Sequence, residues 1–170
     1  MSGPERTLDA AAELFAVHGV GGVGMGEIAR AAGCSRATLY RYFADRRELH
    51  LAFVHREARR VGAEVAAETA GVADPAERLT TAVLASVRRV RAAPALHAWF
   101  GAGDAATTAQ LAQSSAVIEA LGLSLTDDEE AARWLVRVIV SLLTVPGRDD
   151  ADEKALVERF VVPGIRRARR

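Results

Sequence analysis

Residues 28–48 read IARAAGCSRATLYRYFADRRE, and this stretch decides how the N-terminal part of the chain folds. Gly33 stands where a helix has to end and the backbone has to enter the left-handed region. Ser35 follows as an N-cap, because its hydroxyl can accept from an otherwise unpaired backbone N–H. Leu39 and Phe43 lie four residues apart and so share one buried face of the next helix. The stretch therefore predicts a helix, a tight turn and a second helix.

The second of these helices, expected over 36–43, turns a different set of side chains outward. The outward residues are Arg36, Ala37, Thr38, Tyr40, Arg41 and Tyr42. A short helix with an exposed edge of donors, set after a tight glycine turn, fits the major groove of DNA. We expect Arg36 to contact a guanine edge or a phosphate, and Thr38 to contact a thymine methyl group or a phosphate.

The remaining polar side chains of this region are expected to contact the DNA backbone. The hydroxyls of Tyr40 and Tyr42 are expected to donate to phosphates, with packing inside the module as their alternative role. Arg46 stands at the start of the following helix and is also expected to bind phosphate. Arg47, its neighbour, is expected to be a solvated charge.

Charge is distributed unevenly along the chain, although the formal net charge is zero. Residues 28–60 hold eight arginines and three acids, whereas residues 101–160 hold eleven acids and five bases. Because a phosphate responds to the local field rather than to the net charge, the first segment suits a polyanion. The acidic second segment discourages the rest of the protein from binding DNA.

Length and composition restrict the class of protein. With 170 residues, half of them hydrophobic, the chain can bury a sizeable core. Its single cysteine, Cys34, excludes an internal disulfide and suits a reducing compartment. No signal-peptide pattern opens the chain, and its longest apolar run, 134–145, contains Arg137 and is too short to span a bilayer. We expect a cytoplasmic protein without a membrane segment.

Helix signals account for nearly the whole chain. Capping boxes at 2–5 and 126–129 and the pair Asp74-Pro75 predict helix starts, and glycine and proline clusters at 19–24 and 146–147 predict helix ends. The expected helical segments are 2–18, 25–32, 36–43, 45–69, 74–93, 94–100, 104–121, 126–145 and 150–162. The chain is therefore predicted to be all-α, with about nine helices.

The expected helical segments 126–145 and 150–162 each have one unusual feature. The segment 126–145 is apolar on almost all sides, so we expect it to be buried on several sides. Residues 136–140 alone would also suit a strand, but the capping box, the length and the lack of a partner strand favour a helix. Pro163-Gly164 is expected to end the last helix.

With these residues in place, about the first 55 positions resemble the DNA-binding domain of the tetracycline-repressor (TetR) family. The matching residues are Ala11-Ala12, Leu14-Phe15, Gly19, Ile28-Ala29, Ala32-Gly33, Ser35, Thr38-Leu39-Tyr40, Tyr42-Phe43, Arg46 and Leu49. The rest of the chain is similar only in being helical with a hydrophobic penultimate helix. Family members often have Thr at the position of Gly24 and polar contacts near Gly26, so this chain offers phosphate only backbone N–H groups there.

The resemblance implies two domains and three partners. Residues 1–48 would be a three-helix helix-turn-helix DNA-binding domain, and residues 49–170 a helical ligand-binding and dimerisation domain. The expected partners are a pseudo-palindromic double-stranded DNA operator, a largely apolar small-molecule effector and a second copy of the chain. The homodimer would pair through the last two long helices, and the effector would release the operator by changing the spacing of the two reading heads. No cofactor is expected.

An apolar pocket with a few polar tips is expected in the C-terminal part. Its candidate lining residues are Leu84, Leu96, His97, Trp99, Phe100, Leu111, Ile118, Trp134 and Arg137. Trp99 and Phe100, next to two glycines, are expected to form the gate, and His97 and Arg137 to meet a polar group of the ligand. Plain core is the alternative for each of these residues.

Signals of enzyme chemistry are weak. Gly19, Gly21 and Gly24 match G-x-G-x-x-G, but a dinucleotide site needs a strand before that motif and here a helix precedes it. His50 and His55 face different sides of a helix, and no metal or nucleophile motif completes them. We therefore expect a transcriptional repressor and not an enzyme. The alternatives are a helical small-molecule carrier with a vestigial DNA-binding module, and a ligand-independent regulator or activator.

Overall fold

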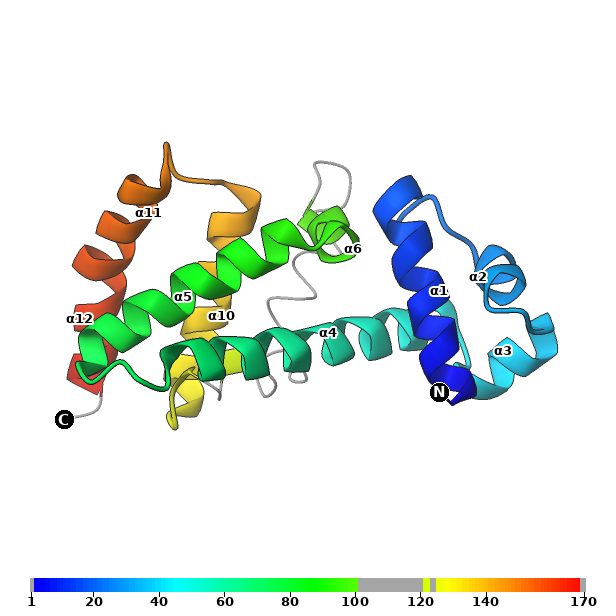
Figure 1. Cartoon of the computed structure of the whole chain (residues 1–170), viewed down its shortest axis with the longest axis horizontal. Coiled ribbons are helices and arrows are strands. Elements are labelled where there is room, and N and C mark those ends of the chain that lie inside the picture. The colour runs from blue at the N-terminus through cyan, green and yellow to red at the C-terminus, as the bar shows by residue number, and fades with distance from the viewer. Residues whose placement is uncertain (1, 101–120, 123–124, 169–170) are drawn as a thin grey trace.

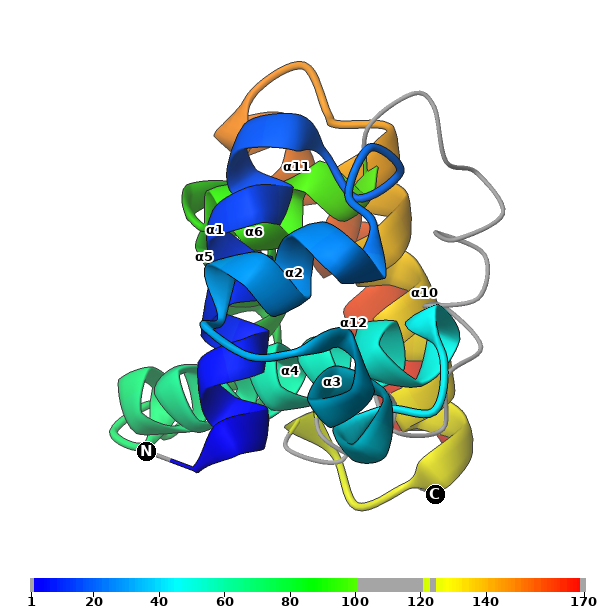
Figure 2. The same cartoon turned by 90° about the vertical axis from the view of Figure 1, so that its right-hand side faces the viewer.

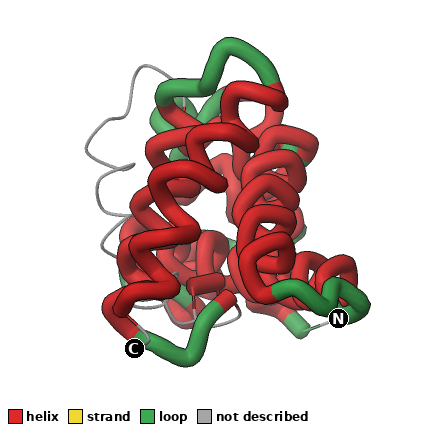
Figure 3. The backbone as a smooth tube through the Cα atoms, turned by 90° about the vertical axis from the view of Figure 1, so that its left-hand side faces the viewer, coloured by secondary structure: helices red, strands yellow, loops and turns green. Residues whose placement is uncertain are grey.

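The computed structural model describes residues 2–100, 121–122 and 125–168, and every regular element within them is a helix (Figures 1 and 3). The elements are α1 (Gly3–His18), α2 (Met25–Ala31), α3 (Arg36–Tyr42), α4 (Arg46–Thr69), α5 (Pro75–Ala92), α6 (Pro94–His97), η1 (Ala98–Phe100), α10 (Glu129–Thr144), α11 (Asp150–Leu156), η3 (Val157–Val161) and α12 (Val162–Ala168). The all-α prediction is confirmed. The helix expected over 104–121 falls outside the described residues, except at its last position.

Helices α1, α2 and α3 form a small bundle at one end of the molecule, which Figure 2 shows from that end. Phe15, Ile28, Leu39 and Leu49 are fully buried where these helices meet the start of α4. Burying a side chain of this size contributes about 2 kcal/mol to folding. Helix α4 then leaves the bundle and runs without a break to the other helices (Figure 1).

The remaining helices form a body in which α5 packs against α4, α6, α10 and the C-terminal helices (Figure 1). A continuous set of buried apolar residues joins this body to the N-terminal bundle through α4. The two parts therefore share one core.

Most of the expected caps are present. The carboxylate of Asp45 accepts from the N–H of Glu48 at 2.7 Å, and that of Asp74 accepts from the N–H of Glu77 at 2.8 Å. The sequence predicts that a capping box starts at Thr126, but in the structure the N-cap lies two residues later. Asp128 is the N-cap of α10 and accepts from the N–H of Ala131 at 2.9 Å. The buried Thr126 hydroxyl accepts from the N–H of Asp128 instead, which places the first turn later.

The prediction that Pro163-Gly164 ends the last helix is wrong. The chain stays helical through Pro163 to Ala168, because the wide turn η3 precedes the proline. In that turn the N–H of Val162 donates to the carbonyl of Val157, five residues earlier. Pro163 lacks an N–H, and its ring needs the room that a wider turn provides in the preceding backbone.

Helix α10 is buried on one face only, although we expected burial on several sides. Leu135, Ile139 and Leu142 lie in the core, whereas the side chain of Trp134 is 51% exposed and Arg137 is also exposed. The helix packs on α5 and η1 with its buried face. The aromatic side chain of Trp134 is thus left on the solvent side of the helix.

Candidate DNA-binding surface and ligand cavity

The turn between α2 and α3 has the geometry that the sequence predicts. Gly33 has φ +65°, in the left-handed region that glycine adopts without strain. The N–H of Cys34 returns to the carbonyl of Ala29 at 2.9 Å, which closes the end of α2. Ser35 then caps α3 by accepting from the N–H of Thr38 at 3.0 Å. This turn sets the direction of α3 relative to α2.

Helix α3 presents a polar face to solvent and an apolar face to the core. Arg36, Ala37, Tyr40 and Arg41 are exposed, the side chain of Tyr40 by 46%. Thr38 is half-buried, and its hydroxyl lies 2.9 Å from that of Ser35. Because Leu39 and Phe43 hold the helix from beneath, the exposed donors are presented on a fixed support.

Tyr42 is half-buried and packs on the beginning of α1. A Cβ added at Gly3 would lie 2.6 Å from Cζ of Tyr42, so the ring lies directly over this glycine. The guanidinium of Arg41 lies 5.7 Å from the centre of the same ring. The structure thus places Tyr42 between α3 and α1, in the packing position that we named as its alternative role.

Arg46 donates to the backbone of the loop between α1 and α2. Its guanidinium lies 2.7 Å from the carbonyl oxygen of Val20 and 3.1 Å from that of Gly21, and its Nε lies 3.4 Å from Nε2 of His50. This contact is not predicted from the sequence, because the two carbonyls are 25 and 26 residues away in the chain. No sequence signal indicates it.

Arg36 lies over α2. A Cβ added at Gly26 would approach the Arg36 guanidinium to 3.2 Å, so the absence of a side chain at Gly26 leaves this space to the arginine. The Arg36 guanidinium, which we expect to reach DNA, therefore lies at the junction of α2 and α3.

Two arginines of α4, Arg56 and Arg60, form ion pairs with acidic side chains of the protein. Arg56 lies 2.7 Å from Asp9 of α1, and it also pairs with Glu57 at 3.0 Å. Burial alone lowers the pKa of Arg56, but the hydrogen bond that it donates to Asp9 and the charge of Glu57 outweigh burial and raise that pKa. Arg60 pairs with Glu57 and Glu64, both at 2.9 Å. The positive charge counted over 28–60 is therefore partly neutralised inside the protein.

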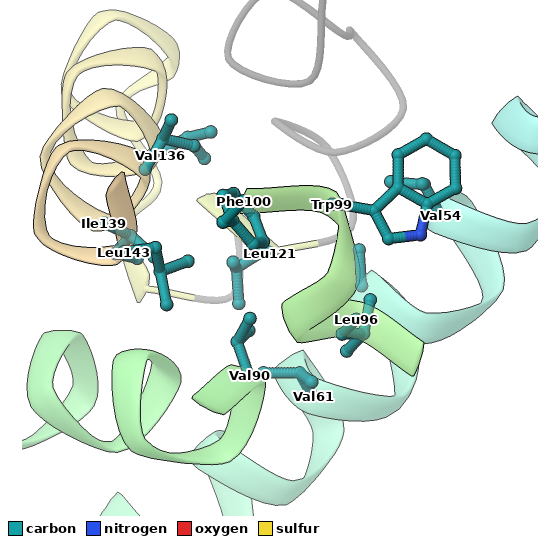
Figure 4. A pocket seen from close by; sticks show the side chains of 12 residues that line it. Val54, Val61, Val90, Leu96, Trp99, Phe100, Leu121, Val136, Ile139 and Leu143 are labelled. Carbon is teal, nitrogen blue, oxygen red and sulfur yellow. The ribbon is translucent and has the colours of Figure 1, made fainter. Parts of the chain in front are cut away.

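A cavity lies in the body, between α4, α5, α6, η1 and α10 (Figure 4). It is lined by Val54, Ala58, Val61, Val90, Leu96, Trp99, Phe100, Leu121, Val136, Ile139, Val140 and Leu143. Its volume is about 50 Å³, and it is partly open to solvent. Its lining is almost entirely apolar, as in pockets that bind small ligands.

Three of the nine predicted lining residues, Leu96, Trp99 and Phe100, line this cavity. The other described ones are Leu84, which is half-buried, and His97, Trp134 and Arg137, which are exposed; none of these four lines the cavity. Leu111 and Ile118 lie outside the described residues. Helical phase explains the exposed residues on α10, because Trp134 and Arg137 flank the inward pair Leu135 and Val136.

The residues that the sequence analysis missed come mainly from α4 and α10. Val54, Ala58 and Val61 belong to the apolar stripe of α4, and Val136 and Ile139 to that of α10. The stripes themselves are visible in the sequence. Which part of each stripe borders empty space depends on how the helices cross, and this is a tertiary property.

Trp99 connects the cavity to the N-terminal bundle. Its ring lies edge-to-face against Phe15 of α1 at 5.8 Å and stacks on Phe53 of α4 at 6.0 Å. His50 packs on the same indole at 5.0 Å, and Phe15 also contacts Phe53 at 5.3 Å. Four rings from α1, α4 and η1 thus form one cluster that borders both the cavity and the bundle.

Comparisons with known proteins agree with this geometry. Residues 8–53 match the family model for bacterial regulatory proteins of the tetR family. Over 168 residues the chain is 48% identical to Rv1255c of Mycobacterium tuberculosis, an HTH-type transcriptional regulator, and the match covers 94% of this chain and 83% of the relative. The chain belongs to the TetR family. This TetR-family protein is therefore a sequence-specific DNA-binding transcriptional regulator, in a family of regulators and not of enzymes.

Solved structures show the same fold. The TetR-family repressor AlkX from a Dietzia strain, implicated in biodegradation of n-alkanes, has a TM-score of 0.75 at 19% identity, covering 98% of this chain and 97% of AlkX. RolR in complex with resorcinol has a TM-score of 0.73 at 20% identity, covering 95% of this chain and 86% of RolR. None of the described helices has the length and apolar character that a membrane crossing requires.

Proposed function

We propose that this TetR-family regulator is a repressor that a small, largely apolar molecule releases from a pseudo-palindromic operator. The main support is the outer face of α3, where Arg36, Tyr40 and Arg41 are exposed on a helix that is anchored by its opposite face. A regulator of transcription works where the chromosome is, so we place the protein in the cytoplasm.

In this proposal residues 1–48 form the DNA-binding domain and α3 enters the major groove. Arg36 reads a base edge, Ala37 and Thr38 lie nearest the bases, and Tyr40 and Arg41 bind phosphates. Tyr42 and Arg46 take part at the edge of this surface, where Tyr42 holds α3 against α1 and Arg46 holds the start of α4 against the loop between α1 and α2. Affinity then comes mostly from phosphate contacts and falls steeply with salt.

Residues 49–170 form the regulatory domain and the dimer interface. We place the interface on α10 and the C-terminal helices, the last two long helical segments of the chain. Exposed apolar side chains on these segments support this: Trp134 is 51% exposed, Val145 73% and Phe160 63%. Large apolar side chains left in water on a helix face are typical of a surface that a partner covers.

The cavity is the proposed effector site, and the four-ring cluster is the proposed link to DNA. A ligand in the cavity touches Trp99, and Trp99 touches Phe15 of α1. A shift of Trp99 therefore moves α1 and, with it, the helix that reads DNA. RolR, a protein of this fold, has been solved with the small aromatic molecule resorcinol.

The test is a gel-shift series with the full chain and DNA from upstream of its own gene, followed by selection of preferred sites. Arg36→Ala should relax base preference at one position per half-site, with a loss of about 1–3 kcal/mol on the preferred base. Tyr40→Phe should weaken binding to all sequences alike. If both variants bound the operator as the parent does, the assignment of α3 as the reading helix would be wrong.

The same series separates the alternatives. A protein that binds ligands but no DNA would be a small-molecule carrier with a vestigial DNA-binding module. A protein that binds its operator regardless of every ligand would be a ligand-independent regulator. Transcription from the operator promoter in a strain that lacks the gene distinguishes a repressor, whose loss raises transcription, from an activator.

A further inference from the structure

We propose that the effector is an uncharged, hydrocarbon-like molecule that the cavity holds by apolar contact alone, and that the cavity rejects acidic molecules of the same shape. This inference rests on the proposed function, because it takes the cavity as the effector site. It goes further by naming the chemical class of the effector and by removing the polar anchors that the sequence suggested.

The lining carries this inference. Valine, alanine, leucine and isoleucine side chains approach from α4, α5, α6 and α10, and Figure 4 shows Val61, Val90, Ile139 and Leu143 turned toward the same space. Among the described lining residues, the indole nitrogen of Trp99 is the only polar side-chain atom. A cavity with such walls offers water almost no hydrogen bond, so an apolar molecule that enters it displaces water at little cost.

The polar residues next to the lining in sequence point elsewhere. His97 stands between the lining residues Leu96 and Trp99, but its side chain is exposed. Arg137 directly follows Val136 and is exposed as well. A carboxylate or phosphate in the cavity would therefore lose its water without meeting a charged partner from the described residues, which is strongly unfavourable.

The walls also suggest a shape. Trp99 and Phe100 contribute flat rings, and aromatic faces favour stacked or edge-on contact with a planar partner. The small volume of the cavity, about 50 Å³, favours a compact molecule.

The experiment compares hydrocarbons with their own carboxylates. Toluene, naphthalene and n-decane are titrated into the full chain, each beside its acid, namely benzoate, 2-naphthoate and decanoate. Binding is followed by calorimetry and by the fluorescence of Trp99, in a Trp134→Phe background that leaves Trp99 as the sole tryptophan. We expect saturable binding of at least one hydrocarbon, and at least tenfold weaker binding of its acid. Equal or tighter binding of the acids, or no binding of any hydrocarbon, would overturn the inference.

A matched pair of variants locates the binding. Val136→Phe fills the cavity and should weaken hydrocarbon binding at least tenfold. Val138→Phe makes the same change two residues along α10, at a half-buried position outside the lining, and should leave binding unchanged. Circular dichroism melting checks both folds, and if Val136→Phe does not fold, the hydrocarbon and acid pairs still decide. Equal effects of two folded variants would count against this site.

The DNA readout keeps the two proposals apart. A hydrocarbon that binds in the cavity but leaves the operator complex intact would contradict ligand release and support the effector-site chemistry. An acid that binds and releases the operator would support ligand release and overturn the hydrocarbon class. Binding is measured without DNA, so neither result depends on the other.

Discussion

Arg46 ties the start of α4 to the loop between α1 and α2 through the carbonyls of Val20 and Gly21. Because these hydrogen bonds are partly solvated, we expect Arg46→Ala to lower the free energy of unfolding by about 1 kcal/mol. It should also weaken binding to every DNA sequence alike, since it loosens the support of α3. Urea unfolding and gel shifts on specific and random DNA measure both effects.

Arg47 is the matched control for that prediction. It is the next residue, it is exposed, and its replacement by alanine should change stability by less than about 0.5 kcal/mol. If Arg46→Ala and Arg47→Ala unfolded alike, the contact to the loop would contribute nothing to stability.

Residues whose contacts are local were predictable from the sequence. Ser35 caps the helix that begins at the next residue, and Gly33 has the positive φ that its place in the turn requires. Arg46 and Tyr42 were not predictable in the same way, because Val20 and Gly3 reach them only through the packing of α1. A chemical type suited to phosphate does not reveal whether the protein itself already uses it.

At the scale of the elements, a partly buried ion pair holds the α10–α11 connection against α5. Glu153 lies 2.7 Å from Arg91, and it also accepts from the N–H of Gly147 at 2.9 Å. The hydrogen bond from Arg91 is the main cause that lowers the pKa of Glu153. The side chain of Glu153 is only 5% exposed and that of Arg91 is 30% exposed, so water reaches this pair from the arginine side only.

We expect Glu153→Gln to lower the free energy of unfolding by about 2 kcal/mol at pH 7. The native pKa of Glu153 lies below its unfolded value, so its contribution is present above the unfolded pKa, near 4.3, and is lost as the pH falls through the native pKa. The difference between parent and variant should therefore shrink in acid. Urea unfolding at pH 7 and at about pH 2.5, below the unfolded pKa of a glutamate, measures it.

Glu158→Gln is the control at the same scale. Glu158 pairs with Lys154 at 3.8 Å, and both side chains are about half exposed. An exposed pair of this kind contributes little, so its loss should be barely measurable at either pH. A gap for Glu153→Gln that stays constant down to about pH 2.5 would contradict the titration argument.

Helix boundaries followed the sequence wherever a cap or a break was local. Asp45 and Asp74 are the N-caps of α4 and α5, as predicted. The N-cap of α10 is Asp128 and not the predicted Thr126. The last helix passes Pro163 because the turn before it widens. A proline therefore predicts a disturbance of a helix more safely than it predicts its end.

At the scale of the whole molecule, the proposed dimer gives a direct prediction. Trp134→Asp combined with Phe160→Asp places charges in the proposed interface, so we expect the protein to become monomeric and to bind its operator more weakly at equal protomer concentration. Analytical ultracentrifugation and gel shifts measure the two effects. Val17→Asp, at a 75% exposed position on α1, should leave the oligomeric state unchanged. A double variant that sediments as the parent does would place the interface elsewhere.

The position of the cavity is the part of the site that the sequence could not predict. Leu96, Trp99 and Phe100 are predicted as lining residues because they form an aromatic and apolar group beside glycines. They do line the cavity. Val54 and Val136 face the same cavity from helices about 80 residues apart in the chain. Periodicity shows that each faces inward, but only the crossing of α4 and α10 leaves space between them.

Helix α4 is one uninterrupted helix that joins the N-terminal bundle to the body of the molecule. Its 24 residues span about 36 Å, from the reading head at one end to α5 at the other. A tilt of about 5° at the ligand end would displace the far tip by about 3 Å, close to the rise of one DNA base pair. Near its N-terminal end, α4 is held to α1 by the ion pair between Arg56 and Asp9. Further along, Glu64 of α4 pairs with Arg89 of α5 at 2.6 Å. In the proposed mechanism, a ligand beside Trp99 that tilts α4 would shift α3 out of register with the duplex.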